Sequence, residues 1–171
     1  MKNVWIFFCI LVIVSCSREK MNSPFTLIDY TYNDGWTGTY FIKIDSIGQT
    51  YIKGYHIKKG KFFVRTEMTP IVMDSLFTLV NSINFTNVDT LYKEHCQDCG
   101  YYYLMIDRQN VPINIFVDNI NNENIELVEV NKLTNYLNLL VRTIYTKIDS
   151  VQFEGDLRGF SLIPPPPLLK H

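Results

Sequence analysis

Hydrophobic and polar residues alternate through four short segments in the first half of the chain. Alternation with a period of two is typical of strands that bury one face of a sheet and expose the other. Turn-forming residues separate these segments, among them Asn33-Asp34-Gly35 and Gly48. The pattern predicts strands over residues 25–32, 37–45, 50–57 and 61–67, joined as an antiparallel meander.

A different period, close to that of a helix, appears in two later segments. Thr69-Pro70 is typical of a helix start, and apolar residues then recur at helical spacing as far as Ile83. A longer stripe begins near Ile125, and its apolar residues are Val130, Leu133, Leu137, Leu140, Val141 and Ile144. We expect two helices, of which the longer covers one face of the sheet.

A second hairpin is predicted between the two helices. Its strands are expected over Tyr101–Asp107 and Val111–Val117, with a turn at Arg108-Gln109-Asn110. Pro112 has no backbone N–H to donate, which favours an edge position for its strand. Strands that cluster rather than alternate with helices indicate an α+β fold. We expect an antiparallel sheet, made of a four-strand meander and a hairpin, with the helices packed on one face.

The N-terminus has the layout of a bacterial export signal. Lys2 precedes an unbroken apolar run from Val4 to Val14, and this run is about half as long as the roughly 20 residues of a membrane-spanning helix. The segment Ile13-Val14-Ser15-Cys16 closes the run and resembles the lipobox of bacterial lipoproteins, in which the cysteine sulfur carries diacylglycerol. The alternative is an ordinary signal peptide followed by an incidental cysteine.

These features divide the chain into four parts. Residues 1–15 are the expected lipoprotein signal peptide, 16–24 a lipidated tether, 25–150 one α+β domain, and 151–171 a proline-rich tail. About 155 residues remain after cleavage, which is the usual size of one domain. The four consecutive prolines of the tail favour an extended polyproline II conformation.

The lipobox, the meander turning at Asp45-Ser46-Ile47-Gly48-Gln49-Thr50-Tyr51, the two sheet-covering helices and the proline-rich tail resemble small lipoproteins of the Bacteroidota of unknown role. The resemblance implies a lipoprotein of the cell envelope and brings no catalytic motif with it. Ser17 rather than aspartate follows Cys16, which in familiar Gram-negative sorting permits transit to the outer membrane. We therefore expect the outer membrane as the location.

The overall charge argues against a nucleic acid partner. The chain has 16 Lys and Arg residues and 17 Asp and Glu residues, which gives a formal net charge of −1. The chain as a whole therefore has no positive field with which to hold nucleic acid.

Cys96 and Cys99 are the main chemical clue in the domain. Once the signal is removed and Cys16 is acylated, they are the two cysteines left in an oxidising compartment. Their spacing suits a structural disulfide, or a metal site completed by His95 and a further histidine or carboxylate. A redox pair is disfavoured because Gly100 and a strand, not a helix, follow them, and unpaired thiols are the remaining alternative.

Two features suggest a binding surface. The basic residues of the third and fourth strands and their turn are Lys53, Lys58, Lys59, Lys61 and Arg65. This patch could meet anionic glycans or phospholipid headgroups, or it could keep an exposed strand edge from pairing with other sheets. The second feature is an abundance of aromatic residues: Trp36, Tyr51, Tyr55, Phe62, Phe63, Tyr92 and Tyr101-Tyr102-Tyr103. These could form a stacking platform or pack in the core.

The sequence contains neither HExxH nor GxSxG, so no catalytic residue is named. We expect a lipid-anchored module that binds an envelope protein or glycan, rather than an enzyme, and we expect no cofactor. One alternative is a metal- or thiol-dependent site at Cys96 and Cys99 with His95. Another is an inhibitor or immunity-type lipoprotein.

Overall fold

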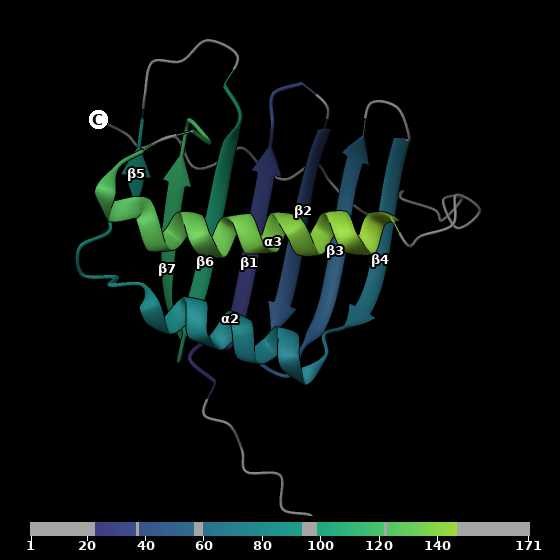
Figure 1. Ribbon diagram of the computed structural model, residues 1–171, viewed down its shortest axis with the longest axis horizontal. Coiled ribbons are helices and arrows are strands. Elements are labelled where there is room, and N and C mark those ends of the chain that lie inside the picture. Colours follow the sequence, from purple (N-terminus) through teal and green to yellow (C-terminus); the bar gives the residue numbers. More distant parts are fainter. Residues whose placement is uncertain (1–22, 37, 57–59, 94–98, 122, 147–171) are drawn as a thin grey trace, which may run out of the picture.

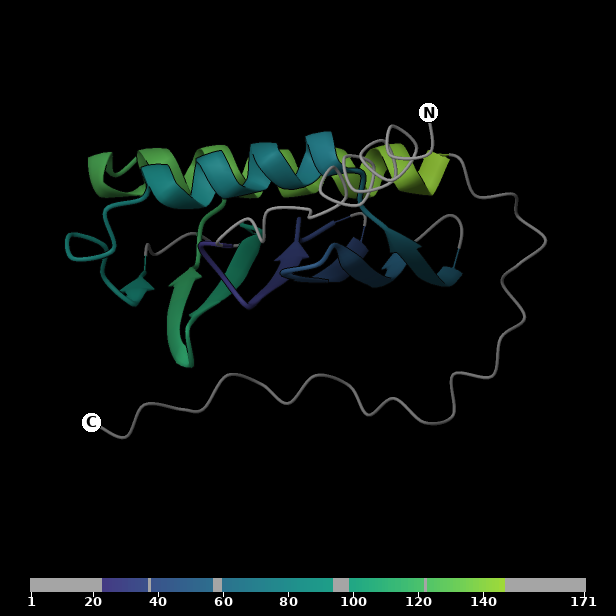
Figure 2. The same ribbon diagram turned by 90° about the horizontal axis from the view of Figure 1, so that it is seen from below.

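The computed structural model describes residues 23–36, 38–56, 60–93, 99–121 and 123–146. In this part of the chain seven strands form one sheet, and two helices lie across one of its faces (Figure 1 and Figure 2). The elements in chain order are β1 (Leu27–Asn33), β2 (Gly38–Asp45), β3 (Gln49–His56), β4 (Gly60–Glu67), α2 (Pro70–Ser82), β5 (Leu91–Tyr92), β6 (Tyr101–Arg108), β7 (Val111–Val117), the 3-10 helix η1 (Ile125–Leu127) and α3 (Val128–Thr146).

The strands are arranged in the order β4-β3-β2-β1-β6-β7-β5. The first four strands form the predicted antiparallel meander, and the β6–β7 hairpin joins it through antiparallel pairing of β6 with β1. The six predicted strands begin and end within two residues of their expected ranges. The predicted α+β fold, with an antiparallel meander and hairpin and helices on one face, is confirmed.

The sequence pattern does not predict β5, whose two residues fall in a segment expected to be a loop. Leu91 and Tyr92 pair in parallel with Phe116 and Val117 of β7. A strand of this length is too short to show an alternating pattern. Because of this pairing, β5 is the edge strand and β7 is not, so the edge position predicted for the Pro112 strand is wrong for β7 as a whole. Pro112 itself lies where β7 has no second neighbouring strand within the described residues, so its missing N–H costs no ladder hydrogen bond.

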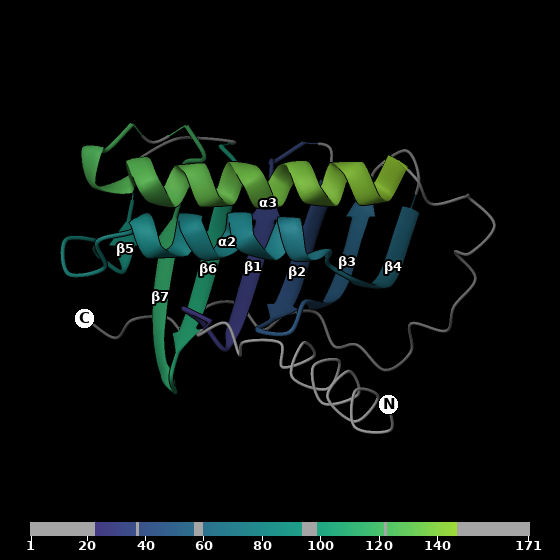
Figure 3. The same ribbon diagram turned by 60° about the horizontal axis from the view of Figure 1, so that its bottom comes forward.

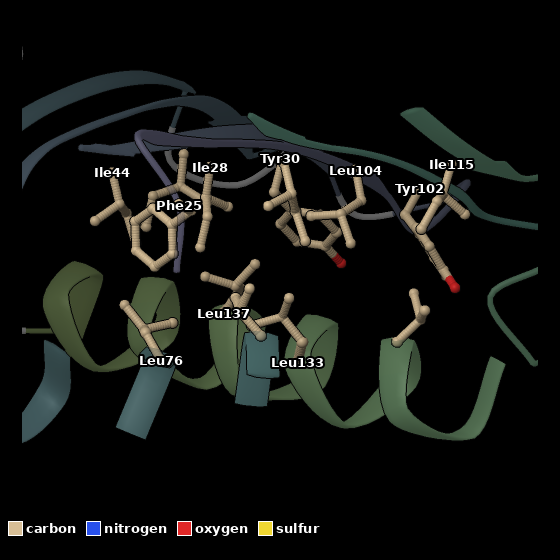
Figure 4. Packing of buried hydrophobic residues seen from close by; sticks show 14 of the residues in the cluster. Phe25, Ile28, Tyr30, Ile44, Leu76, Tyr102, Leu104, Ile115, Leu133 and Leu137 are labelled. Carbon is tan, nitrogen blue, oxygen red and sulfur yellow. The ribbon is translucent and has the colours of Figure 1, made fainter. Parts of the chain in front are cut away.

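One apolar core lies between the sheet and the two helices, which run side by side (Figure 3). Alternate strand residues such as Ile28, Tyr30 and Leu104 point toward Leu133 and Leu137 of α3 (Figure 4). All five side chains are completely buried. Burial of each aliphatic side chain stabilises the fold by roughly 1.5–3 kcal/mol, so the helix-facing side of the sheet supplies most of the packing.

The turn between β2 and β3 also holds the segment that leads into α2. The Asp45 Oδ1 atom accepts hydrogen bonds from the backbone N–H groups of Ile47 and Gln49, at 3.0 and 2.9 Å. Gly48 adopts the left-handed backbone conformation, with φ of +89°, which a side chain would make costly. The Gly48 carbonyl then accepts a hydrogen bond from Met68 N–H at 2.9 Å, immediately before α2.

Candidate functional site

The sheet has an open face, by which we mean the face that α2 and α3 leave uncovered (Figure 2). Successive strand residues point to opposite faces, so the neighbours of the buried residues point away from the helices. The aromatic residues on this face are Phe41, Tyr51, Tyr55, Phe63, Tyr101, Tyr103 and Phe116. They come from five strands, so aromatic side chains extend across most of the sheet.

On β6 and β7 the rings of the open face pack against one another. The ring centroids of Tyr101 and Phe116 are 5.8 Å apart. The Tyr103 hydroxyl donates a hydrogen bond to Asn114 Oδ1 at 2.5 Å. Burial raises the pKa of Tyr103, with a further rise from the Asp29 carboxylate, so this hydroxyl stays protonated at neutral pH. These contacts hold the rings in place and leave them half-buried.

On β3 and β4 the open face is built from three successive cross-strand pairs. Each pair joins one aromatic ring to one cation, and the pairs are Tyr51 with Arg65, Lys53 with Phe63, and Tyr55 with Lys61. We call them the aromatic–cationic pairs. The exposed fractions of Tyr51, Phe63 and Tyr55 are 36%, 47% and 50%. This half of the open face therefore presents more ring surface to a ligand than the β6–β7 half.

Two of these cations lie over aromatic rings. The Arg65 guanidinium carbon is 5.5 Å from the centroid of the Tyr51 ring. The Lys53 Nζ atom is 5.9 Å from the centroid of the Phe41 ring. At exposed sites such an interaction stabilises the arrangement by about 0.5–1 kcal/mol. It keeps positive charge next to the ring surface, where a ligand that stacks on the rings would meet it.

The open face of β3 and β4 has a surplus of positive charge. Within these two strands, three cations, Lys53, Lys61 and Arg65, share this surface with one carboxylate, Glu67, at the end of β4. On the neighbouring strand β2, Lys43 is paired with Asp29 of β1 at 3.1 Å. Among the described residues of β3 and β4, cations therefore outnumber carboxylates beside the exposed rings.

The structure brings together part of the predicted basic patch. Lys53, Lys61 and Arg65 lie on the same face of neighbouring strands, whereas Lys58 and Lys59 lie outside the described residues. Lys61 and Arg65 belong to β4, which is an edge strand of the sheet. Their position is consistent with both interpretations of the patch, namely ligand binding and protection of the edge.

The predicted aromatic platform is divided between the two faces of the sheet. Three of its members, Phe62, Tyr92 and Tyr102, are buried in the core. Trp36 lies in the β1–β2 turn and is 71% exposed. The other members lie on the open face, together with Phe41 and Phe116, which the sequence interpretation did not include. The alternation of buried and exposed residues along β2 and β7 puts both side chains on the open face, and this sequence pattern could have identified them.

Cys99 lies just before β6 and is disulfide-bonded. The other three cysteines, including Cys96, and the candidate metal ligand His95 lie outside the described residues. Within the described part of the chain, no three His, Cys, Asp or Glu side chains are grouped so that they could hold a metal ion. A Cβ atom on Gly100 would lie 2.3 Å from the backbone oxygen of Asn33, so this segment packs tightly against the end of β1.

Sequence reasoning also missed a group of fully or partly buried tyrosines that hydrogen-bond to α3. The hydroxyls of Tyr30 and Tyr40 both donate to Asn138 Oδ1, and the Tyr102 hydroxyl donates to Asn131 Oδ1 at 2.9 Å. Burial raises the pKa of Tyr30 well above its ordinary value, and the neighbouring Tyr40 adds to the effect. The hydroxyl therefore remains a donor at neutral pH, and the cluster is a satisfied part of the core. The sequence pattern that could have indicated this cluster is the pair of asparagines seven residues apart, which lie on the sheet-facing side of α3.

The predicted anchor, Cys16, and the signal before it lie outside the described residues. No helix in the described part of the chain combines the length and the apolar content that crossing a bilayer requires. The sequence matches no known family model, and a search of curated proteins finds no significant similarity.

Proposed function

We propose that this protein is a lipid-anchored lipoprotein of the cell envelope whose domain binds an envelope macromolecule on its open face. The row of aromatic–cationic pairs on β3 and β4 is the observation that carries the proposal. Exposed rings offer contact area that loses little conformational entropy on binding, and the adjacent cations add charge recognition. The apolar run from Val4 to Val14 and the lipobox-like segment that ends at Cys16 support attachment to a membrane, with the outer membrane as the proposed location.

Binding without catalysis is our proposal for the domain, and the bonded state of Cys99 supports it. A metal-ligating or nucleophilic cysteine must be present as a thiolate. Cys99 is instead engaged in a disulfide, for which we propose Cys96 as the partner because the two are close in sequence. A structural disulfide suits a binding module, whereas a thiol-dependent site with His95 would first require reduction.

The binding part of the proposal is tested with envelope fragments from the cells that make the protein. The full chain, purified in non-ionic detergent, should sediment with these fragments in a saturable manner. The double substitution Tyr51→Ser with Tyr55→Ser should weaken binding about tenfold or more, because exposed tyrosines are frequent binding hot spots. Trp36→Ser is the matched control, since it removes an exposed ring from a turn, and it should bind as the wild type does. Equal binding by all three proteins would overturn the proposal.

The anchor is tested in the same cells with a labelled fatty acid. The wild-type chain should incorporate the label, and Cys16→Ser should not, because the acyl chains are attached to the cysteine that this variant lacks. Label in the Cys16→Ser variant would contradict lipidation at this position.

A further inference from the structure

We propose that the open face of β3 and β4 binds an acidic polysaccharide. The inference rests on the proposed function and specifies the ligand of that same surface. Such a polymer offers two chemistries along one chain, namely the apolar C–H faces of its sugar rings and its negatively charged groups. The aromatic–cationic pairs present the complement of both, one of each kind in every pair.

The rings are arranged as a row rather than as a pocket. Tyr51 and Tyr55 lie on the same face of β3, four residues apart, with Lys53 between them and Phe63 opposite it on β4. Side chains on one face of a strand repeat every two residues, or roughly 7 Å. A repeated flat surface of this kind fits an extended polymer of similar units. Tyrosine suits the role because its ring packs on C–H groups while its hydroxyl forms hydrogen bonds with sugar hydroxyls.

The cations repeat along the same row. Arg65 lies opposite Tyr51, and Lys61 lies opposite Tyr55. A guanidinium group binds a carboxylate or sulfate through two parallel hydrogen bonds, and a lysine ammonium attracts it as a point charge. A sugar stacked on either tyrosine would therefore have a cation beside it to bind its acidic group.

The composition of the surface favours this ligand over a protein partner. The centres of protein interfaces are rich in aromatic residues and depleted in lysine. On this surface Lys53 and Lys61 alternate with the rings instead of lying around them. Anionic lipid headgroups would also satisfy the cations, and tyrosine rings are common at membrane interfaces, so the test includes lipid vesicles as a competing ligand.

The test uses two polyanions and their uncharged counterparts. Polygalacturonate is compared with its methyl-esterified form, and dextran sulfate with dextran, by isothermal titration calorimetry on the full chain in non-ionic detergent. We expect at least one of the polyanions to bind, its uncharged counterpart to bind about tenfold or more weakly, and added salt to reduce the affinity.

Single substitutions locate the binding. Tyr55→Ser and Arg65→Gln should each weaken polyanion binding about threefold to tenfold, the loss of one exposed contact. The matched controls are Trp36→Ser and Lys132→Gln, since Lys132 is an exposed cation of α3 on the opposite side of the molecule. Both controls should bind as the wild type does, and thermal unfolding should show that all four variants are folded.

Each of the following results would overturn the inference. The first is equal affinity for a polyanion and its uncharged counterpart, and the second is equal loss in the control variants. The third is binding of phosphatidylglycerol vesicles through Tyr55 and Arg65 without binding of either polyanion, which would assign the surface to lipid. If envelope fragments require Tyr51 and Tyr55 while neither polyanion binds, the proposed function stands and the polysaccharide is wrong. If the fragments do not require these tyrosines, the proposed function itself fails.

Discussion

At the scale of single residues, a few hydrogen bonds, together with apolar packing, position α3 on the helix-covered face of the sheet. Tyr30 is completely buried, and its hydroxyl must find an acceptor because an unpaired buried polar group is costly. Asn138 supplies one acceptor atom to the hydroxyls of both Tyr30 and Tyr40. One side chain of α3 is thereby bonded to two neighbouring strands, which fixes how the helix lies on the sheet.

Replacing Asn138 by leucine should destabilise the fold by about 2 kcal/mol, because both hydroxyls lose their acceptor. The matched control is Asn135→Leu, an exposed position of the same helix, which should change stability by less than about 0.5 kcal/mol. Urea unfolding of the full chain, followed by circular dichroism, measures both variants. Adding Tyr30→Phe and Tyr40→Phe to Asn138→Leu should restore part of the loss, since donors and acceptor are then removed together. Equal losses for Asn138→Leu and Asn135→Leu would contradict this account of the cluster.

Alternation within a strand predicts which residues share a face, but not which face the helices cover. The alternation of a strand puts Tyr102 on the opposite face from Tyr101 and Tyr103, and in the structure Tyr102 is the one that lies in the core. It did not show that Tyr101 would lie next to Phe116, because that contact depends on the register of two strands. The candidate site was therefore visible in the sequence as separate basic and aromatic features, and only the cross-strand register joins them into pairs.

At the scale of the elements, the loop that carries Cys99 is held against the first hairpin. Gly100 makes this possible, because a Cβ atom there would lie 2.3 Å from the Asn33 oxygen and 2.8 Å from the Asp34 Cα atom. The Gly100 carbonyl also accepts a hydrogen bond from Ile120 N–H at 3.1 Å. The segment before β6 thus contacts both the β1–β2 turn and the loop that leads to α3.

Gly100→Ala should destabilise the protein by about 1–3 kcal/mol, the usual cost of inserting a methyl group where backbone atoms already fill the space. Gly60→Ala is a useful comparison, because the space around Gly60 is open and the only cost of the side chain is the left-handed backbone conformation, with φ of +77°. That variant should lose about 1 kcal/mol. Thermal unfolding of the full chain measures both, and a Gly100→Ala protein as stable as the wild type would show that the loop can move away from β1.

Elements with a clear period were predicted well, and elements that depend on distant pairing were not. The four strands of the meander, the β6–β7 hairpin and both helices follow from patterns within a few residues. The pairing of β1 with β6 joins residues as far apart as Leu27 and Asp107, and no local pattern specifies it. The two-residue strand β5 exists only because β7 offers it an edge.

At the scale of the whole molecule, the two faces of the sheet have different roles in this account. The helix-covered face supplies the packing that makes the fold stable, as Figure 4 shows for its central residues. The open face carries rings and cations that the core does not use. A lipid anchor at Cys16 would keep that surface in the envelope, close to the polysaccharides that we propose as its ligands.

The central claim is that the open face, and not the helix layer, contacts the ligand in the cell. Its most direct test is to place the photo-reactive residue p-benzoylphenylalanine at Tyr55 of the open face or at Ile71 of α2, which is 78% exposed. After illumination of intact cells, the account predicts adducts from position 55, with sugar identified in them by mass spectrometry, and none from position 71. Adducts from position 71 alone would place the binding surface on the helices and contradict the account.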